Sequence, residues 1–273
     1  MKSLTDCEGI PYPIFTTGNV TMCETVKGAK PEGSVYCVKI EVTDEKSQCP
    51  VPGQFYMLRS EKSQQLLARP ISVFHAQKTS TGLEISFLIL LKGKGTHELC
   101  NLEADDRVQV LGPLGNVFPK PESSSKVLIV GGGIGVAPVA GFAEILPEKS
   151  YDFIASFKSG SYGIENLKAD TLTITTDDGS YKEKGFAIDF MKKDIEEHMV
   201  DMIFACGPLP MLKAVKKYAD ENNIKCQISL EEKMGCGIGA CLGCAVKVVS
   251  GDEPRYGHVC KEGPVFYSTD VEI

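Results

Sequence analysis

The chain is short of positive charge. Its 273 residues include 29 lysines and arginines against 36 aspartates and glutamates, which gives a formal net charge of −7. Basic residues never cluster beyond a neighbouring pair. Proteins that bind nucleic acids usually carry a basic patch that neutralises phosphates. We therefore expect no nucleic-acid partner.

Long apolar segments are also missing. The longest uncharged run, residues 127–143, is broken by glycines and a proline and is shorter than the roughly 20 residues that span a bilayer. Residues 1–8 contain no apolar core of a signal peptide. We expect neither a membrane span nor a secretory signal, and therefore a cytoplasmic protein. Internal repeats and low-complexity tracts are absent as well. A length of 273 residues leaves room for two or three compact domains.

Cysteine is abundant, with 11 residues, and four of them form a pattern. Cys236, Cys241 and Cys244 follow a C-x4-C-x2-C spacing, and Cys260 comes fifteen residues later. This suits the ligand set of a plant-type [2Fe–2S] cluster. The loop also contains glycines that let the backbone wrap a small anionic core and point its amides at sulfur: Gly235, Gly237, Gly239 and Gly243.

A structural zinc site is the alternative for these cysteines, but zinc knuckles usually come as two C-x2-C pairs. The remaining seven cysteines are scattered, and we interpret most of them as buried thiols. A disulfide scaffold is not expected in a chain of this length without a secretory signal.

The hydrophobic pattern changes near residue 120. Residues 16–118 contain short strands separated by turns, which predicts a small antiparallel barrel of five or six strands. From residue 126, strands alternate with helices, which predicts a doubly wound parallel sheet. The predicted strands are 126–130, 151–156, 171–175, 201–205 and 226–230, and the clearest helix is 208–222. We expect three domains: 1–120, 121–225 and a cysteine-rich module at 226–273.

Two stretches of the predicted barrel suit a flavin nucleotide. Arg69-Pro70-Ile71-Ser72 opens a strand, and its arginine, held by a rigid proline, suits bidentate binding of a pyrophosphate. Gly95-Thr96 offers backbone amides and a hydroxyl to a second phosphate. An R-P-x-S tetrapeptide is weak evidence alone, and the cluster motif downstream strengthens it.

A glycine turn in the second domain suits a dinucleotide. The strand at 127–130 runs into Gly131, Gly132, Gly133 and Gly135, and Pro138 falls where the first turn of a helix is expected. A pyrophosphate binds well at such a helix N-terminus. A tight turn between strand and helix is the simpler reading. However, Cys206-Gly207-Pro208 ends a later strand at the same predicted sheet edge.

The order of these motifs resembles the ferredoxin–NADP reductase superfamily. With the cysteine motif added, the chain resembles the electron-transfer subunits of NAD-dependent (type B) dihydroorotate dehydrogenases. Further stretches that carry this resemblance are 112–118, 176–180, 206–215 and 259–266. The resemblance implies an antiparallel FAD-binding β-barrel, a nicotinamide-binding α/β domain and a C-terminal [2Fe–2S] module.

Carried onto this sequence, the resemblance implies FAD contacts from Arg69, Pro70, Ile71, Ser72, Leu88, Ile89, Leu90, Gly95 and Thr96, and cluster ligation by Cys236, Cys241, Cys244 and Cys260. The family often has an aromatic and a basic residue where this chain has Ile89 and Leu90, so backbone contacts are expected there. The Cys206 thiol is expected near the nicotinamide, or simply as a buried apolar group.

The resemblance also implies a function and a partner. Dihydroorotate would be oxidised at FMN on a separate catalytic subunit, and electrons would pass through the cluster and FAD to NAD⁺ in de novo pyrimidine (UMP) biosynthesis. FAD would lie between the cluster and the nicotinamide because it exchanges both hydride and single electrons. The expected assembly is a heterotetramer with two copies of each subunit. This chain shows no candidate base for the substrate, so we expect no catalytic residue of its own.

Two rivals remain. One is a related FAD and [2Fe–2S] reductase subunit of sulfide, sulfite or ferredoxin metabolism. The other is a non-enzymatic, zinc-bearing interaction module with a vestigial nucleotide fold. A zinc protein would be colourless, whereas flavin and cluster absorb visible light.

NAD(H) is expected over NADP(H). Asp177 and Asp178 follow the third strand of the second domain, and Lys158 is the nearby cation in these loops. A 2′-phosphate usually needs an arginine, whereas a carboxylate favours a free ribose hydroxyl. We therefore predict that Asp177 or Asp178 borders the nucleotide pocket.

Overall fold

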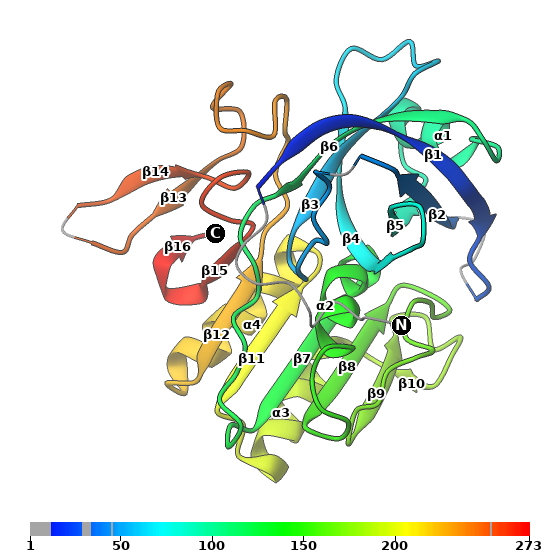
Figure 1. Cartoon of the computed structure of the whole chain (residues 1–273). Coiled ribbons are helices and arrows are strands. Elements are labelled where there is room, and N and C mark those ends of the chain that lie inside the picture. The colour runs from blue at the N-terminus through cyan, green and yellow to red at the C-terminus, as the bar shows by residue number, and fades with distance from the viewer. Residues whose placement is uncertain (1–11, 29–33, 45, 252) are drawn as a thin grey trace.

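The computed structural model describes residues 12–28, 34–44, 46–251 and 253–273. The octapeptide considered for a signal peptide, and Cys7 within it, lie outside the described residues. A barrel, a sheet with helices and a smaller C-terminal module make up the fold (Figure 1). No helix among the described residues is both long enough and apolar enough to cross a membrane.

The first part is a closed antiparallel barrel of six strands, as the sequence predicts. Its strands follow the order β1-β2-β5-β4-β3-β6. Phe87, Leu58 and Ile85 are among the side chains that fill its core, each at most 1% exposed. The bounds are β1 Ile14–Thr25, β2 Val35–Val42, β3 Phe55–Ser60, β4 Arg69–Lys78, β5 Leu83–Leu90 and β6 Arg107–Leu114, with helix α1 Lys94–Cys100 between β5 and β6.

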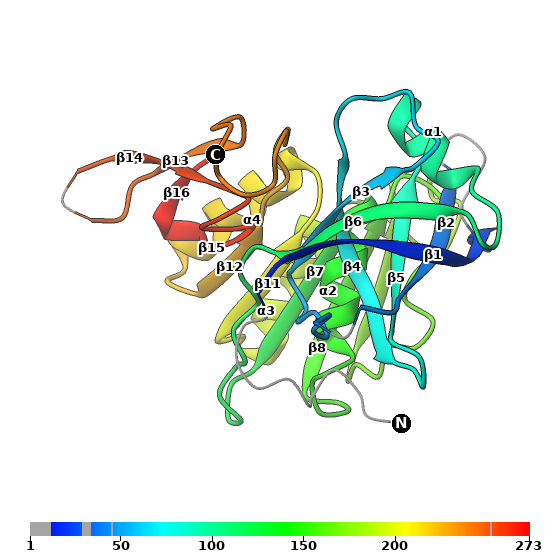
Figure 2. The same cartoon turned by 45° about the horizontal axis from the view of Figure 1, so that its top comes forward.

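The second part is a seven-stranded sheet in the order β10-β9-β8-β7-β11-β12-β15. Helix α2 lies between this sheet and the barrel, and α3 and α4 pack on the opposite face (Figure 2). The bounds are β7 Val127–Gly132, η3 Gly133–Gly135, α2 Val136–Ala143, β8 Tyr151–Phe157, β9 Leu172–Thr176, β10 Glu183–Lys184, α3 Ala187–His198, β11 Met202–Cys206, α4 Leu209–Glu221, β12 Lys225–Ser229 and β15 Val265–Tyr267.

Burial on both faces explains the continuous apolar runs in this part. In β7, Leu128 and Val130 belong to the core under α3 and α4, whereas Val127 and Ile129 pack with α2. Parallel strands covered by helices on both sides are apolar at every position for this reason. All five predicted strands are present, with ends shifted by at most two residues.

The C-terminal module is more closely joined to the sheet than we expected. The sequence suggests a segment appended after the last strand, but β15 of this segment pairs antiparallel with β12, through Gln227–Tyr267 and Ser229–Val265. The sheet is therefore mixed, mostly parallel, and β12 itself crosses the domain boundary expected at residue 226.

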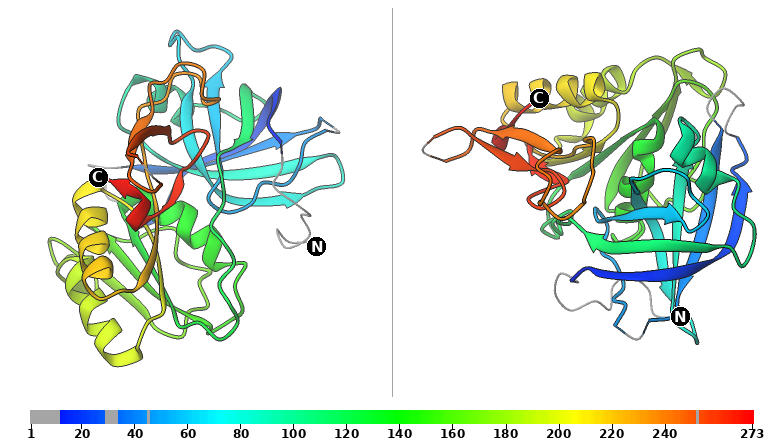
Figure 3. Two further views of the ribbon diagram at one scale, coloured as in Figure 1. Left: turned by 90° about the vertical axis from the view of Figure 1, so that its left-hand side faces the viewer. Right: turned by 90° about the horizontal axis from the view of Figure 1, so that it is seen from above.

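The rest of the module forms a small sheet in the order β14-β13-β16. Its bounds are β13 Ala245–Val248, β14 Arg255–His258, η4 Ser268–Asp270 and β16 Val271–Glu272. The two further views show the orange and red C-terminal segment beside both larger parts (Figure 3).

Candidate flavin, nicotinamide and iron–sulfur sites

The cysteine motif forms an irregular loop that gathers four sulfurs. Cys236, Cys241 and Cys244 lie between β12 and β13, and Cys260 follows β14. The chain turns tightly there because Gly237 and Gly239 adopt φ values of 75° and 81°, a region that favours glycine. The structure thus brings together the four cysteines that the spacing singles out.

Backbone amides point at these sulfurs. Gly239 N–H donates to Cys260 Sγ at 3.1 Å, and Cys241 N–H donates to Cys236 Sγ at 3.3 Å. Cys260 N–H lies 3.5 Å from Cys244 Sγ. Amide donors of this kind stabilise the negative charge of thiolates and tune the potential of a bound cluster. Sulfur ligands with amide donors around them fit an iron–sulfur cluster.

The four thiols differ in environment. The backbone amide of Gly243 holds the pKa of the exposed Cys241 thiol at about 7, below its ordinary value. Burial raises the pKa of Cys260 to about 12, and the neighbouring Cys244 adds to this effect. A metal must therefore displace a proton from Cys260.

The cysteine loop is pressed against the barrel. A Cβ on Gly237 would lie 2.6 Å from Met57 Cγ of β3, so only glycine allows this approach. Asn116, just after β6, fastens the other side of the module. Its Nδ2 donates to the carbonyls of Glu262 and Val265 at 2.9 and 2.7 Å, and its Oδ1 accepts from Val265 N–H at 2.9 Å. Such bonds contribute roughly 1 kcal/mol each.

A cavity of about 280 Å³ opens where the three parts meet. Its size is near the lower end for small-molecule sites, roughly 300–1,000 Å³. Most of the predicted FAD residues line it: Pro70, Ile71, Ser72, Leu88, Ile89, Leu90 and Thr96. Ile89 is only 1% exposed and packs in the barrel core, so its contact with a flavin stays a prediction.

Arg69 and Gly95, the two remaining predicted FAD residues, touch each other beside this cavity. A Cβ on Gly95 would lie 2.0 Å from Arg69 Nε, so the guanidinium rests on the first turn of α1. The Thr96 hydroxyl makes local hydrogen bonds, and its expected contact with a phosphate stays a prediction. Its Oγ1 accepts from Lys92 and Gly93 N–H at 2.9 and 3.0 Å and donates to Gly93 O. The hydroxyl therefore closes the turn that presents the helix.

Sequence reasoning missed the cavity residues that come from other parts of the chain. Ile134 enters from the glycine turn and Ala137 from the first turn of α2, and Glu231 and Met234 come from the segment between β12 and the cysteines. Glu231 is exposed as a residue, but the surrounding protein desolvates its carboxyl and raises its pKa. The one available signal in the sequence was an acidic residue, Glu231, between an apolar strand and the cysteine motif, which could have indicated a cavity wall.

The glycine turn and the Cys206 loop meet at the carboxyl edge of the sheet. Gly131 and Gly132 end β7, Gly133 and Gly135 form η3, and Pro138 lies in the first turn of α2. A Cβ on Gly135 would lie 2.6 Å from the Cys206 carbonyl carbon and from Gly207 Cα.

The second loop presses equally closely on β7. A Cβ on Gly132 would lie 2.9 Å from Pro208 Cδ. Cys206 is 2% exposed, and burial strongly raises the pKa of its thiol. The two predicted loops thus form one continuous rim at the edge where α/β sheets bind ligands.

The two aspartates lie farther along the same edge. Asp177 and Asp178 follow β9, which β8 separates from the glycine turn on β7. Asp177 N–H donates to Phe157 O at 3.0 Å, and the Asp178 carboxylate accepts from Ser180 N–H at 2.9 Å. A role for these residues at the nucleotide stays a prediction.

The barrel, the nucleotide-type sheet and the four-cysteine loop define a reductase fold of the FAD-binding type that carries an iron–sulfur module. The model of the "iron-sulfur cluster binding domain of dihydroorotate dehydrogenase B" matches residues 231–272.

Two curated relatives are electron transfer subunits of dihydroorotate dehydrogenase B (NAD⁺). The protein from Clostridium acetobutylicum is 39% identical over 253 residues, which cover 92% of this chain and 96% of the relative. The protein from Caldanaerobacter subterraneus is 39% identical over 235 residues, which cover 85% of this chain and 91% of the relative.

A solved structure of an NADH-dependent reduced ferredoxin-NADP oxidoreductase is also similar. It is 30% identical, has a TM-score of 0.73 and covers 92% of this chain and 90% of its own. The chain belongs to the family of electron transfer subunits of dihydroorotate dehydrogenase B (NAD⁺).

Proposed function

We propose that this chain carries electrons from dihydroorotate, oxidised at FMN on a separate catalytic subunit, to NAD⁺ in pyrimidine biosynthesis. It would do so with a [2Fe–2S] cluster held by Cys236, Cys241, Cys244 and Cys260, and with FAD in the cavity between the parts. When bound, a cluster supplies single-electron transfer, FAD exchanges single electrons and hydride, and nicotinamide exchanges hydride.

One observation carries the proposal: the cavity has walls from all three parts of the chain. Ser72 belongs to the barrel, Ile134 to the glycine turn and Met234 to the cysteine loop. A flavin held there would lie between the nicotinamide edge and the cysteines. The protein's task is to hold these groups close together and away from water.

The barrel residues divide the work of holding FAD. Arg69 would bind the pyrophosphate bidentately beside the first turn of α1. Pro70, Ile71 and Ser72 of β4, and Leu88 to Leu90 of β5, would support the ring through backbone groups and apolar contact. This assignment rests on their shared cavity.

The nicotinamide nucleotide would bind along the rim of the two loops. Its pyrophosphate would meet the amides at Gly133 and Gly135 and the N-terminus of α2. We propose NAD(H) as the co-substrate because the two aspartates, Asp177 and Asp178, directly follow β9, whereas the lysines of these loops, Lys158 and Lys182, are not arginines that would pair a 2′-phosphate bidentately. A carboxylate suits a free ribose hydroxyl and repels a 2′-phosphate.

The FMN subunit would dock over the cysteine loop, in an assembly of two copies of each subunit. Ile238 and Leu242, which flank Cys241, are 55% and 60% exposed. Apolar side chains beside an exposed cysteine suit a partner that excludes water. Electron transfer to another protein also requires that the cluster lie near the surface.

A mixing experiment tests the proposal. The isolated chain, loaded with FAD and cluster, should oxidise NADH with an artificial acceptor but should not reduce NAD⁺ with dihydroorotate. Adding the FMN catalytic subunit should produce dihydroorotate-dependent reduction of NAD⁺. Ile238→Glu should weaken this coupled activity and spare the artificial-acceptor activity, whereas Tyr256→Glu, a 72% exposed residue on β14, should spare both.

The similarity to the NADH-dependent ferredoxin-NADP oxidoreductase supplies the competing outcome. If the mixture failed to reduce NAD⁺ with dihydroorotate but did so with reduced ferredoxin, the chain would serve ferredoxin metabolism instead. A colourless protein containing zinc and no iron would contradict both functions.

A further inference from the structure

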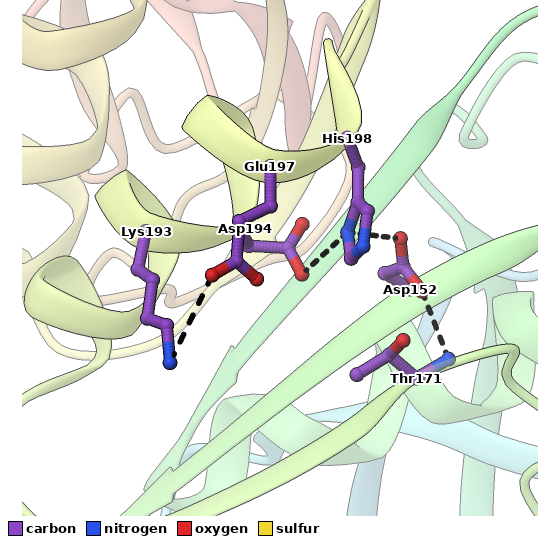
Figure 4. A network of polar contacts seen from close by, with 6 residues as sticks. All are labelled: Asp152, Thr171, Lys193, Asp194, Glu197 and His198. Carbon is purple, nitrogen blue, oxygen red and sulfur yellow. Dashed lines mark hydrogen bonds and ion pairs between the residues drawn. The ribbon is translucent and has the colours of Figure 1, made fainter.

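A cluster of polar side chains lies at the amino edge of the sheet, away from the cofactor sites. Asp152 is near the start of β8, in register with Leu128 near the start of β7. Asp194 and His198 lie one turn apart at the end of α3 and project toward it (Figure 4). The nucleotide rim lies at the opposite, carboxyl edge, so this cluster belongs to none of the three proposed sites.

The three side chains make an incomplete set of hydrogen bonds. His198 Nδ1 lies 3.3 Å from both Asp152 Oδ2 and Asp194 Oδ1. Asp152 Oδ1 accepts from Thr171 N–H at 2.8 Å, which fixes its carboxylate. The Asp194 side chain is only 8% exposed, and its Oδ2 has no hydrogen-bond partner among the described residues.

A histidine bridge alone accounts poorly for this arrangement. One Nδ1–H cannot point well at two carboxylates, and both distances exceed the usual 2.9–3.0 Å of an N–H···O bond. It also leaves Asp194 Oδ2 buried without a donor, although buried polar atoms are rarely left unsatisfied.

We propose that Asp152, Asp194 and His198 bind one divalent cation of the zinc class. Tetrahedral zinc with bonds of about 2.0–2.1 Å places its donor atoms roughly 3.3 Å apart. Both observed N···O distances are 3.3 Å. All three donor atoms lie within 4.8 Å of one another. Rotation of one carboxylate would close the third edge, and an Asp194 carboxylate bound through both oxygens would also give its buried Oδ2 a partner.

The donor set selects the metal. One imidazole nitrogen with two carboxylates suits Zn²⁺, whereas Mg²⁺ and Ca²⁺ prefer oxygen ligands throughout. The hydrogen bond from Thr171 N–H orients one ligand from outside the site, as is common for bound metals. The side chain of His198 is 40% exposed, so water has access to a fourth coordination position. Such an ion would be structural, joining the end of α3 to β8.

Equilibrium dialysis of the flavin- and cluster-loaded protein against micromolar ZnCl₂ tests the site. Zinc, iron and acid-labile sulfide are measured in the same sample, because zinc could also displace iron from the cysteines. We expect one zinc per chain at unchanged iron and sulfide. Asp194→Asn and His198→Gln should each weaken zinc binding more than about tenfold. Replacing residues that only hydrogen-bond to metal ligands already lowers metal affinity by about tenfold or more.

Glu197→Gln is the matched control. Glu197 lies on the same helix but forms its ion pair with Lys193 at 3.9 Å (Figure 4), so the variant should bind zinc like the parent. Retained flavin and cluster absorption would show that each variant is folded. No bound zinc in the parent, equal zinc binding by His198→Gln, or zinc uptake matched by iron loss would each refute the site.

Discussion

Replacing Gly95 with alanine should release FAD. Alanine is the better helix former by about 1 kcal/mol, so α1 itself should not be weakened. However, the new methyl group would lie 2.0 Å from Arg69 Nε. To regain ordinary contact near 3.4 Å, the guanidinium would have to move by roughly 1.4 Å.

A shift of this size breaks a bidentate contact. Hydrogen bonds between charged groups contribute about 1.5–3 kcal/mol, and about 1.4 kcal/mol corresponds to a factor of ten in affinity. We therefore expect FAD to bind roughly ten- to a hundredfold more weakly. Arg69→Lys should act in the same direction because an ammonium cannot reproduce the planar pair of donors.

The assay is fluorescence titration of the deflavinated protein with FAD. Gly93→Ala is the matched control, because a Cβ there meets nothing within 4 Å and the φ of −148° suits any residue. Equal affinities in Gly95→Ala and Gly93→Ala would refute the role of Arg69 at the pyrophosphate, provided that both variants melt like the parent.

Three further predictions concern the other groups. Cys260→Ser should lower acid-labile sulfide and iron, whereas Cys226→Ser, at a buried cysteine outside the motif, should not; a full cluster in the first variant would remove Cys260 from the ligand set. Desolvation by the surrounding protein raises the pKa of Glu231, so Glu231→Gln and the parent should share one flavin midpoint potential at low pH, where the parent carboxyl is protonated. Above that pKa the parent gains a negative charge beside the flavin, so the flavin midpoint potential of the variant should be higher than that of the parent by roughly 30 mV, about 1.4 kcal/mol for two electrons. If the potentials of the two proteins changed in parallel with pH, Glu231 would lie away from the flavin ring. NADH should give a higher kcat/KM than NADPH with an artificial acceptor, and the reverse order would contradict a ribose contact from Asp177 or Asp178.

The parts predicted best from the sequence are those governed by local pattern. The apolar run at 127–130 must be buried on both faces, so its strand was recognisable without knowledge of its neighbours. The C-x4-C-x2-C spacing likewise places three sulfurs in one loop whatever surrounds it.

What escaped prediction depends on contacts between distant segments. β15 is only three residues long, and its pairing with β12 has no local signature. Asn116 belonged to a stretch that carried the family resemblance, but its three bonds to residues 262–265 appear only in the folded chain. The cavity wall from Glu231 and Met234 was missed for the same reason, since it forms only when the module folds back on the barrel.

The pairing of β15 with β12 has a consequence for kinetics. A redox module on a flexible tether must search for its docking position, and such a search slows in viscous solvent. Here β15 is a strand of the nucleotide-type sheet, and Asn116, just after the last barrel strand β6, is hydrogen-bonded to Val265 of β15. The separation between the cysteines and the cavity is therefore built into the fold. Electron exchange between these two sites should keep the same rate when glycerol or sucrose thickens the medium, and any viscosity dependence of turnover should come from the encounter with the partner or the nucleotide.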